Sequence, residues 1–148
     1  MGRREELAEA EGRAWEELHE LVGRLTPEQI EEPGINADGW STKDLLWHIG
    51  CWTAESARQL ERIRVGTYEE RDWDDTDDLN ARYLEEGRRM DLPTVRSELT
   101  SARARALEEW SLLADPTPEA IEWFEESGAI HYGDHLGELR RYVERLDV

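Results

Sequence analysis

Apolar residues recur at helical spacing over four long stretches of the chain, residues 3–25, 41–64, 92–114 and 129–146. In each stretch they keep to one face, while charged residues cover much of the remaining surface. Strand-like alternation does not persist over a useful length anywhere. The pattern therefore predicts an all-α protein in which four amphipathic helices form a bundle. The predicted core positions are Leu7, Ala14, Leu18, Leu21, Val22, Leu25, Leu45, Ile49, Trp52, Ser56, Leu60, Ile63, Val95, Leu99, Ala102, Ala106, Leu107, Trp110, Leu113, Tyr132, Leu136, Leu139, Val143 and Leu146.

Shorter elements connect these helices. Thr26 precedes a proline and reads as a helix cap, and Pro33 stops that helix after about one turn. The acidic segment 68–78 lacks the glycine and glutamate positions of a calcium-binding EF-hand. We therefore expect its negative charge to favour the start of a short helix over residues 77–89. A second brief capped turn is expected at Thr117.

The chain is short and strongly acidic. Its 148 residues suffice for one core, so we expect residues 1–148 to form a single domain. A formal net charge of -18 repels phosphate backbones and anionic headgroups, which argues against nucleic acid or a membrane surface as partner. The glutamate-rich first twenty residues hold no apolar run, so no signal peptide is expected. Cys51 is the only cysteine, which fits the reducing cytoplasm.

Tryptophan is unusually frequent, with seven residues against one phenylalanine. Its large apolar body with one polar N–H suits the wall of a pocket as well as the gaps between helices, and both roles are open for any one tryptophan. We expect Trp47, Trp52 and Trp123 to line a pocket. The first two flank His48 in the sequence, and the third precedes the last helix.

Two histidines near the end of the chain have the spacing of a shared metal site. His131 and His135 are four residues apart in a predicted helix, so their side chains lie one turn apart on the same face. His48 lies about 60° from the centre of its apolar stripe and can face the bundle groove, whereas His19 lies about 100° away among glutamates. A metal site built from the first three competes with a simpler alternative. In that alternative they are boundary residues, hydrogen-bonded to Glu138 or to backbone carbonyls.

Carboxylates lie near the histidines on the same predicted helices. Glu55 and Glu138 could be bases that activate water or a thiol, and solvation at the surface is the alternative for both. Asp44, one turn before His48, could orient that imidazole or could cap its helix. Cys51 has the character of a small buried side chain, since nothing nearby in the sequence would lower its pKa.

The segment GWSTKDLLWHIGCW at residues 39–52, followed by HYGDHL at 131–136, resembles the DinB-like four-helix superfamily, and the likeness spans nearly the whole chain. This superfamily includes thiol-dependent maleylpyruvate isomerases and bacillithiol transferases. Its pattern is a GWS turn, a histidine early in the second helix and His-x-x-x-His in the last helix, and each occurs here in order.

The resemblance implies an up-down-down-up bundle with a short extra helix in a long crossover, and a homodimer. It also implies that His48, His131 and His135 hold a divalent metal ion, zinc or nickel. Asn80 and its helix are similar to a branch of cyclopropane-hydrolysing resistance proteins, so thiol transfer and hydrolysis both stay open.

The sequence thus favours a cytoplasmic metal-dependent enzyme. The metal would lower the pKa of a low-molecular-weight thiol or of water, for transfer to a small electrophilic substrate or for its hydrolysis. The alternative is a non-catalytic protein that binds or sequesters a metal or a small molecule. Turnover, rather than binding, distinguishes the two.

Overall fold

Helices make up most of the computed structural model, which describes residues 2–146. The long helices are α1 (Arg3–Gly23), α3 (Thr42–Val65), α5 (Leu92–Ser111) and α7 (Ala129–Leu146). The short helices are α2 (Pro27–Glu31), α4 (Thr76–Arg88) and α6 (Pro118–Ser127). Among residues 2–146, extended pairing is confined to one isolated bridge between Pro33 and Ser41. None of the described helices combines the length and the apolar character that a membrane span needs. The prediction of an all-α bundle is confirmed.

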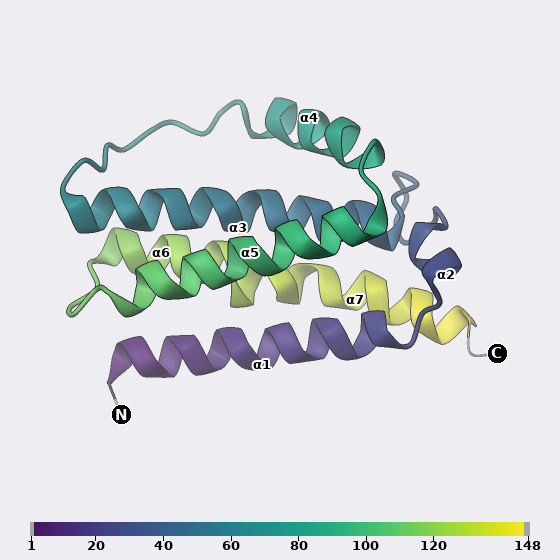
Figure 1. Ribbon diagram of the computed structural model, residues 1–148, viewed down its shortest axis with the longest axis horizontal. Helices are drawn as coiled ribbons and strands as arrows, with labels where there is room; N and C mark the ends of the chain where they lie inside the picture. The colour runs from purple at the N-terminus through teal and green to yellow at the C-terminus, as the bar shows by residue number, and fades with distance from the viewer. Residues whose placement is uncertain (1, 147–148) are drawn as a thin grey trace.

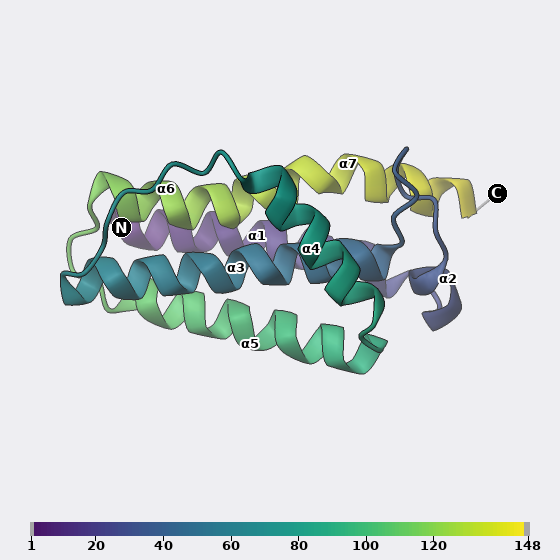
Figure 2. The ribbon, with the colours of Figure 1, turned by 90° about the horizontal axis from the view of Figure 1, so that it is seen from above.

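The long helices have the up-down-down-up order that the resemblance implies (Figure 1). Helices α1 and α7 run in one direction, and α3 and α5 run in the other. Because α3 and α5 are parallel neighbours, the chain must return along the bundle between them. It returns through residues 66–75 and α4, and Figure 2 shows α4 lying across α3. The extra helix in the crossover is therefore present.

Side-chain caps fix where the helices begin. Ser41 Oγ accepts a hydrogen bond from the Asp44 N–H at 3.0 Å, and Asp44 Oδ2 accepts one from the Ser41 N–H at 2.9 Å. This reciprocal pair starts α3, and Thr26 and Gln29 form the same arrangement at α2. Gly66, at φ 81°, ends α3 in the left-handed region that favours glycine. These local signals explain why the helix boundaries are readable from the sequence.

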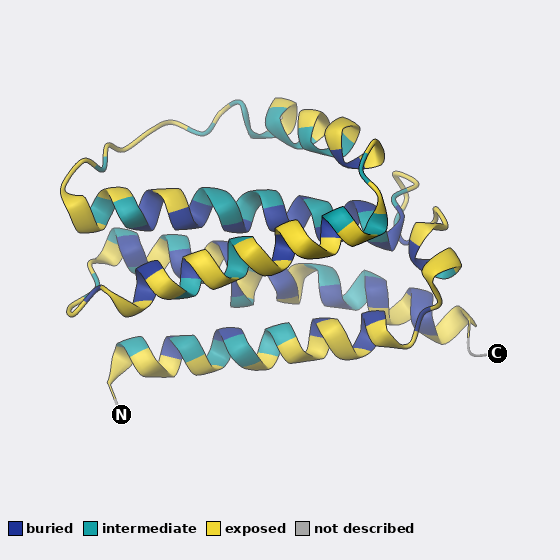
Figure 3. Cartoon of the chain, in the orientation of Figure 1, coloured by how far each residue is buried: buried dark blue, intermediate teal, exposed yellow. Residues whose placement is uncertain are grey.

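Buried side chains line the inward faces of the long helices (Figure 3). They form a large cluster shared by α1, α3, α5 and α7, and a smaller one where Trp110 stacks on Phe124 with ring centroids 4.2 Å apart. Two positions of α7 differ from the prediction. Leu146, expected in the core, is 41% exposed because it lies in the last turn of the helix. Tyr142, which is not among the predicted core positions, is buried and donates a hydrogen bond from its hydroxyl to the Gln29 carbonyl at 3.2 Å.

The segment that follows Thr117 is longer than expected. Instead of a brief capped turn, the structure has the ten-residue helix α6, which buries Ala120 and Phe124. Helix α6 leads directly into α7, with a break at Gly128 (Figure 2). A Cβ atom at Gly128 would lie 2.5 Å from the Phe124 carbonyl oxygen, so the backbone at this break leaves no room for a side chain.

A buried polar cluster links α1, α5 and α7. Glu11, only 3% exposed, accepts hydrogen bonds from Arg103 at 2.7 and 2.8 Å and from the Tyr132 hydroxyl at 3.0 Å. Burial raises the pKa of Tyr132, so its hydroxyl keeps the proton that it donates. Because Tyr132 adjoins His131 in α7, the cluster holds in place the helical turn that carries this histidine.

Candidate metal centre

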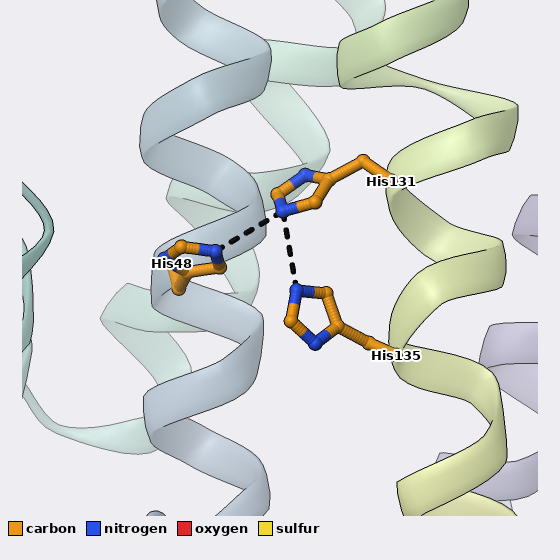
Figure 4. Close-up of side chains that lie close together, drawn as sticks. All are labelled: His48, His131 and His135. Carbon is orange, nitrogen blue, oxygen red and sulfur yellow. Dashed lines mark hydrogen bonds between the residues drawn. The ribbon is translucent and has the colours of Figure 1, made fainter. Parts of the chain in front are cut away.

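Three histidine side chains meet between α3 and α7 (Figure 4). His48 lies in the second turn of α3, and His131 and His135 lie one turn apart near the start of α7. The Nε2 atom of His131 is 3.0 Å from Nε2 of His48 and 3.2 Å from Nε2 of His135. Each residue offers one nitrogen, and these atoms all lie within 4.8 Å of one another. The structure brings together the three residues that helical phase and spacing selected.

The start of α3 positions His48. The Trp40 ring packs edge-on against the imidazole, with ring centroids 5.1 Å apart. Asp44 is used in the cap, where its carboxylate bonds to the Ser41 backbone, and Nδ1 of His48 has no partner in the described part of the chain. Of the two roles considered for Asp44, the structure shows capping.

Two of the three distances between these nitrogens fit a shared cation. Two nitrogens bound to one zinc ion at about 2.05 Å, in tetrahedral geometry, lie about 3.3 Å apart. The two short contacts, 3.0 and 3.2 Å, are close to that value. Each nitrogen of a neutral imidazole carries either one proton or one lone pair. A hydrogen bond donated by His131 Nε2 could therefore explain only one of its two short contacts. A cation at the centre would accept all three lone pairs, and the donor set therefore fits a metal ion.

Burial keeps two of the imidazoles neutral. Burial, together with the smaller effect of the neighbouring histidines, lowers the pKa of His48 to about 4 and the pKa of His131 to about 3. At neutral pH these rings therefore carry no proton that would compete with a metal ion for the lone pair. This electrostatic environment disfavours a buried imidazolium and leaves the ring lone pairs free of protons.

Glu138, predicted as a base, lies against His135. Its Oε1 atom is 2.8 Å from Nδ1 of His135, on the far side of the ring from the three nitrogens that meet. A carboxylate in this position fixes the tautomer with the proton on Nδ1 and leaves the Nε2 lone pair facing inward. Glu138 thus orients His135, and the hydrogen bond that was an alternative to metal binding is compatible with it.

His48 and His131 line one part of a pocket of about 710 Å³, a volume typical of small-ligand sites. Its walls come from α3, the segment before α4, α4 itself, α6 and the start of α7. Trp73 stands edge-to-face between two others, with ring centroids 5.7 Å from Trp52 and 5.3 Å from Trp123. The lining residues are His48, Trp52, Tyr68, Glu70, Arg71, Trp73, Thr76, Asn80, Glu122, Trp123, Glu126, Ser127 and His131.

Trp47 does not lie with the other two predicted pocket tryptophans. It packs under Gly87 of α4, where an added Cβ atom would lie 2.4 Å from Trp47 Cδ1, and it lines a separate cavity between α3 and α5. On a helix, residues five apart point about 140° away from each other. Trp47 and Trp52 therefore face different neighbours, and only Trp52 reaches the pocket.

Glu55 also lies outside the set of lining residues. It forms an ion pair with Arg58 at 3.3 Å and faces α4, where burial, Cys51 and Glu55 together raise the pKa of Tyr83. The Cys51 thiol is half-buried, and burial raises its pKa to about 12, so it is no nucleophile. His19 is exposed on α1 and packs against Trp15 with the two rings tilted by 36°, away from the other histidines.

Sequence reasoning missed the contribution of the crossover. Tyr68, Arg71 and Trp73 line the pocket, although their segment has no regular secondary structure. Asn80 of α4 accepts a hydrogen bond from Trp52 Nε1 at 2.7 Å, which ties the short helix to the wall. A tryptophan within a long acidic segment was the available signal, because such a residue needs an apolar surface to cover it.

The sequence matches a family model described as the mycothiol maleylpyruvate isomerase N-terminal domain over residues 12–140. The chain belongs to this family. A similar fold occurs in the crystal structure of an uncharacterised protein from Escherichia coli UTI89, with a TM-score of 0.82 and 15% sequence identity, covering 98% of this chain and 95% of that one. At that identity the likeness shows the fold alone. No curated protein matches the sequence.

Proposed function

We propose that the protein is a metal-dependent enzyme in which His48, His131 and His135 hold a zinc or nickel ion at the end of the pocket. The observation that supports this most directly is the convergence of three Nε2 atoms, with contacts of 3.0 and 3.2 Å, beside a cavity of about 710 Å³. Three imidazoles suit either ion and leave coordination positions open for a ligand.

When bound, the ion would lower the pKa of a thiol or a water molecule, so that a nucleophile is available near neutral pH. Residues of the chain would orient the metal ligands and enclose the substrate. Glu138 fixes the His135 tautomer, and the half-buried rings of Trp52, Trp73 and Trp123 offer apolar surface to a small electrophilic substrate. Family membership supports a low-molecular-weight thiol as the nucleophile, with hydrolysis by water as the second form of the reaction.

A non-catalytic protein that sequesters a metal or a small molecule is the second candidate. The observation that favours it is the position of the two predicted bases, because Glu138 is engaged by His135 and Glu55 does not line the pocket. Formation of a fluorescent thioether from monochlorobimane and a small thiol, above the uncatalysed rate and dependent on metal, would support the enzyme. Stoichiometric binding without turnover would support sequestration.

Metal content is the decisive test of the centre. Untagged protein purified without a nickel column should contain about one zinc or nickel ion per chain by elemental analysis. His48→Ala and His131→Ala should each lose most of it, since each removes one of three protein ligands. His19→Ala is the matched control and should keep it. Retention by His48→Ala together with loss by His19→Ala would show that the ligand set is wrong.

We also propose that the chain is one domain that forms homodimers in a cytoplasmic setting. Sedimentation equilibrium of the full chain tests the oligomeric state, and a molar mass near the monomer value of 17.3 kDa at all concentrations would exclude a stable dimer.

A further inference from the structure

The charges around the pocket are unsuited to an anionic ligand. Glu70, Glu122 and Glu126 line it with exposed carboxylates, whereas Arg71 is the one arginine or lysine among its described lining residues. The whole chain adds to this field with a formal net charge of -18. A carboxylate on a ligand would therefore meet repulsion along these walls.

Arg71 is itself already engaged. Its Nη2 atom lies 2.5 Å from Asp75 Oδ2, and its Cζ atom lies 4.0 Å from the centroid of the Trp73 ring. A guanidinium over the face of a tryptophan is held by the negative potential of the ring. The Arg71 side chain is thus an organic cation that packs on Trp73 within this pocket.

The neighbouring aromatic rings are fixed in orientation by their polar atoms. Trp52 donates its indole N–H to Asn80 Oδ1 at 2.7 Å, and the Trp123 N–H donates to the Tyr68 hydroxyl at 3.4 Å. Because these N–H groups are occupied within the protein, a ligand meets ring faces and edges rather than free donors. Aromatic faces with carboxylates beside them are the recognition chemistry of ammonium groups.

We propose that this pocket selects ligands in which an ammonium group is carried on an apolar body, the cation packing against Trp52, Trp73 and Trp123 and the charge balanced by the nearby glutamates. The inference rests on the proposed function in that it takes this cavity to be the substrate pocket. In this proposal the pocket walls determine the class of substrate, whichever reaction takes place at the histidines.

Three probes of nearly equal shape test it: choline, its uncharged carbon analogue 3,3-dimethylbutan-1-ol, and the anion 3,3-dimethylbutanoate. Each is titrated into metal-free full-length protein with excess chelator, and the indole N–H signals are followed by NMR. We expect choline to bind about tenfold more tightly than the alcohol, and the anion to bind most weakly. Equal binding of choline and the alcohol, or tighter binding of the anion, would overturn the proposal.

Variants separate the ring from the charges. Trp73→Leu should reduce the preference for choline over the alcohol about fivefold or more. Trp15→Leu is the control, since Arg103 also lies over that ring, 4.5 Å from its centroid, but outside the pocket. Glu122→Gln changes only an exposed side chain, so it provides a test even if Trp73→Leu fails to fold, and it should weaken choline binding about twofold to threefold.

Arg71→Ala gives the sharpest contrast. If Arg71 occupies the cation position, its removal should strengthen choline binding several-fold. If Arg71 instead anchors anions, its removal should leave choline unchanged and weaken the carboxylate probe, which would refute the proposal. Metal binding without cation selectivity would reject this inference alone, and cation selectivity in a protein that never binds metal would reject the proposed function alone.

Discussion

Removal of the Glu11 carboxylate should destabilise the bundle far more than removal of an exposed carboxylate whose ion pair is equally short. In Glu11→Ala, Arg103 loses both of its hydrogen bonds to the carboxylate, and the Tyr132 hydroxyl loses its acceptor. Glu20→Ala is the matched control. Glu20 and Arg24 are 2.7 Å apart, like the shorter Glu11–Arg103 contact, but their side chains are 66% and 51% exposed.

Burial sets the expected magnitudes. Breaking a buried pair costs about 3–5 kcal/mol, because the remaining charge has no partner. The Arg103 side chain is 24% exposed and can be partly hydrated, so we expect a loss of about 3 kcal/mol. An exposed pair contributes about 0–1 kcal/mol. In a domain of this size 1 kcal/mol changes Tm by about 2–4 °C, so Glu11→Ala should melt about 6–12 °C lower.

Urea unfolding followed by circular dichroism at pH 7 measures the free energy of unfolding of Glu11→Ala and Glu20→Ala. Chelator in the buffer removes any contribution from a metal. Unchanged m-values would show that both variants expose the same surface on unfolding. Glu11→Leu combined with Arg103→Met should recover much of the loss, since no unpaired charge stays buried. Equal unfolding midpoints for Glu11→Ala and Glu20→Ala would refute the argument that burial sets this energy.

Three further outcomes are expected. Gly87→Ala should cost about 1–3 kcal/mol, because its Cβ would lie 2.4 Å from Trp47, whereas Gly12→Ala, with open space around it, should be neutral or stabilising; urea midpoints that move in the same direction for both would contradict this. In metal-free protein, His48 and His131 have pKa values of about 4 and about 3 when folded, against about 6.5 when unfolded, so the unfolded state binds more protons. The free energy of unfolding should therefore be highest above about pH 6.5 and fall toward pH 4. In His48→Gln the slope of this free energy against pH should be smaller by up to about 1.4 kcal/mol per pH unit. An unchanged slope would argue against burial of a neutral His48 ring. Added zinc should raise Tm at pH 7 and chelator should reverse it, while identical melting in both would contradict a metal that ties α3 to α7.

The sequence by itself determined the helices and the histidine triad. Apolar periodicity, the caps at Thr26 and Ser41 and the stop at Gly66 are local properties, and local properties decide where a helix begins and ends. Helical phase likewise fixed the direction of His48 relative to its own apolar stripe, because side-chain direction repeats with the helix. These signals needed no knowledge of the neighbouring elements.

Only the tertiary structure decided what surrounds the triad. The segment before α4 has no periodicity, so its sequence does not indicate which apolar surface covers Trp73, and the structure shows that it meets Trp52. Only the docking of α4 at Gly87 decides what covers Trp47. The partners of Glu11 lie far away along the chain, on α5 and α7. Such contacts follow from the packing of whole helices, because a side chain's partner in a crossover or a buried ion pair is set by where other elements come to rest.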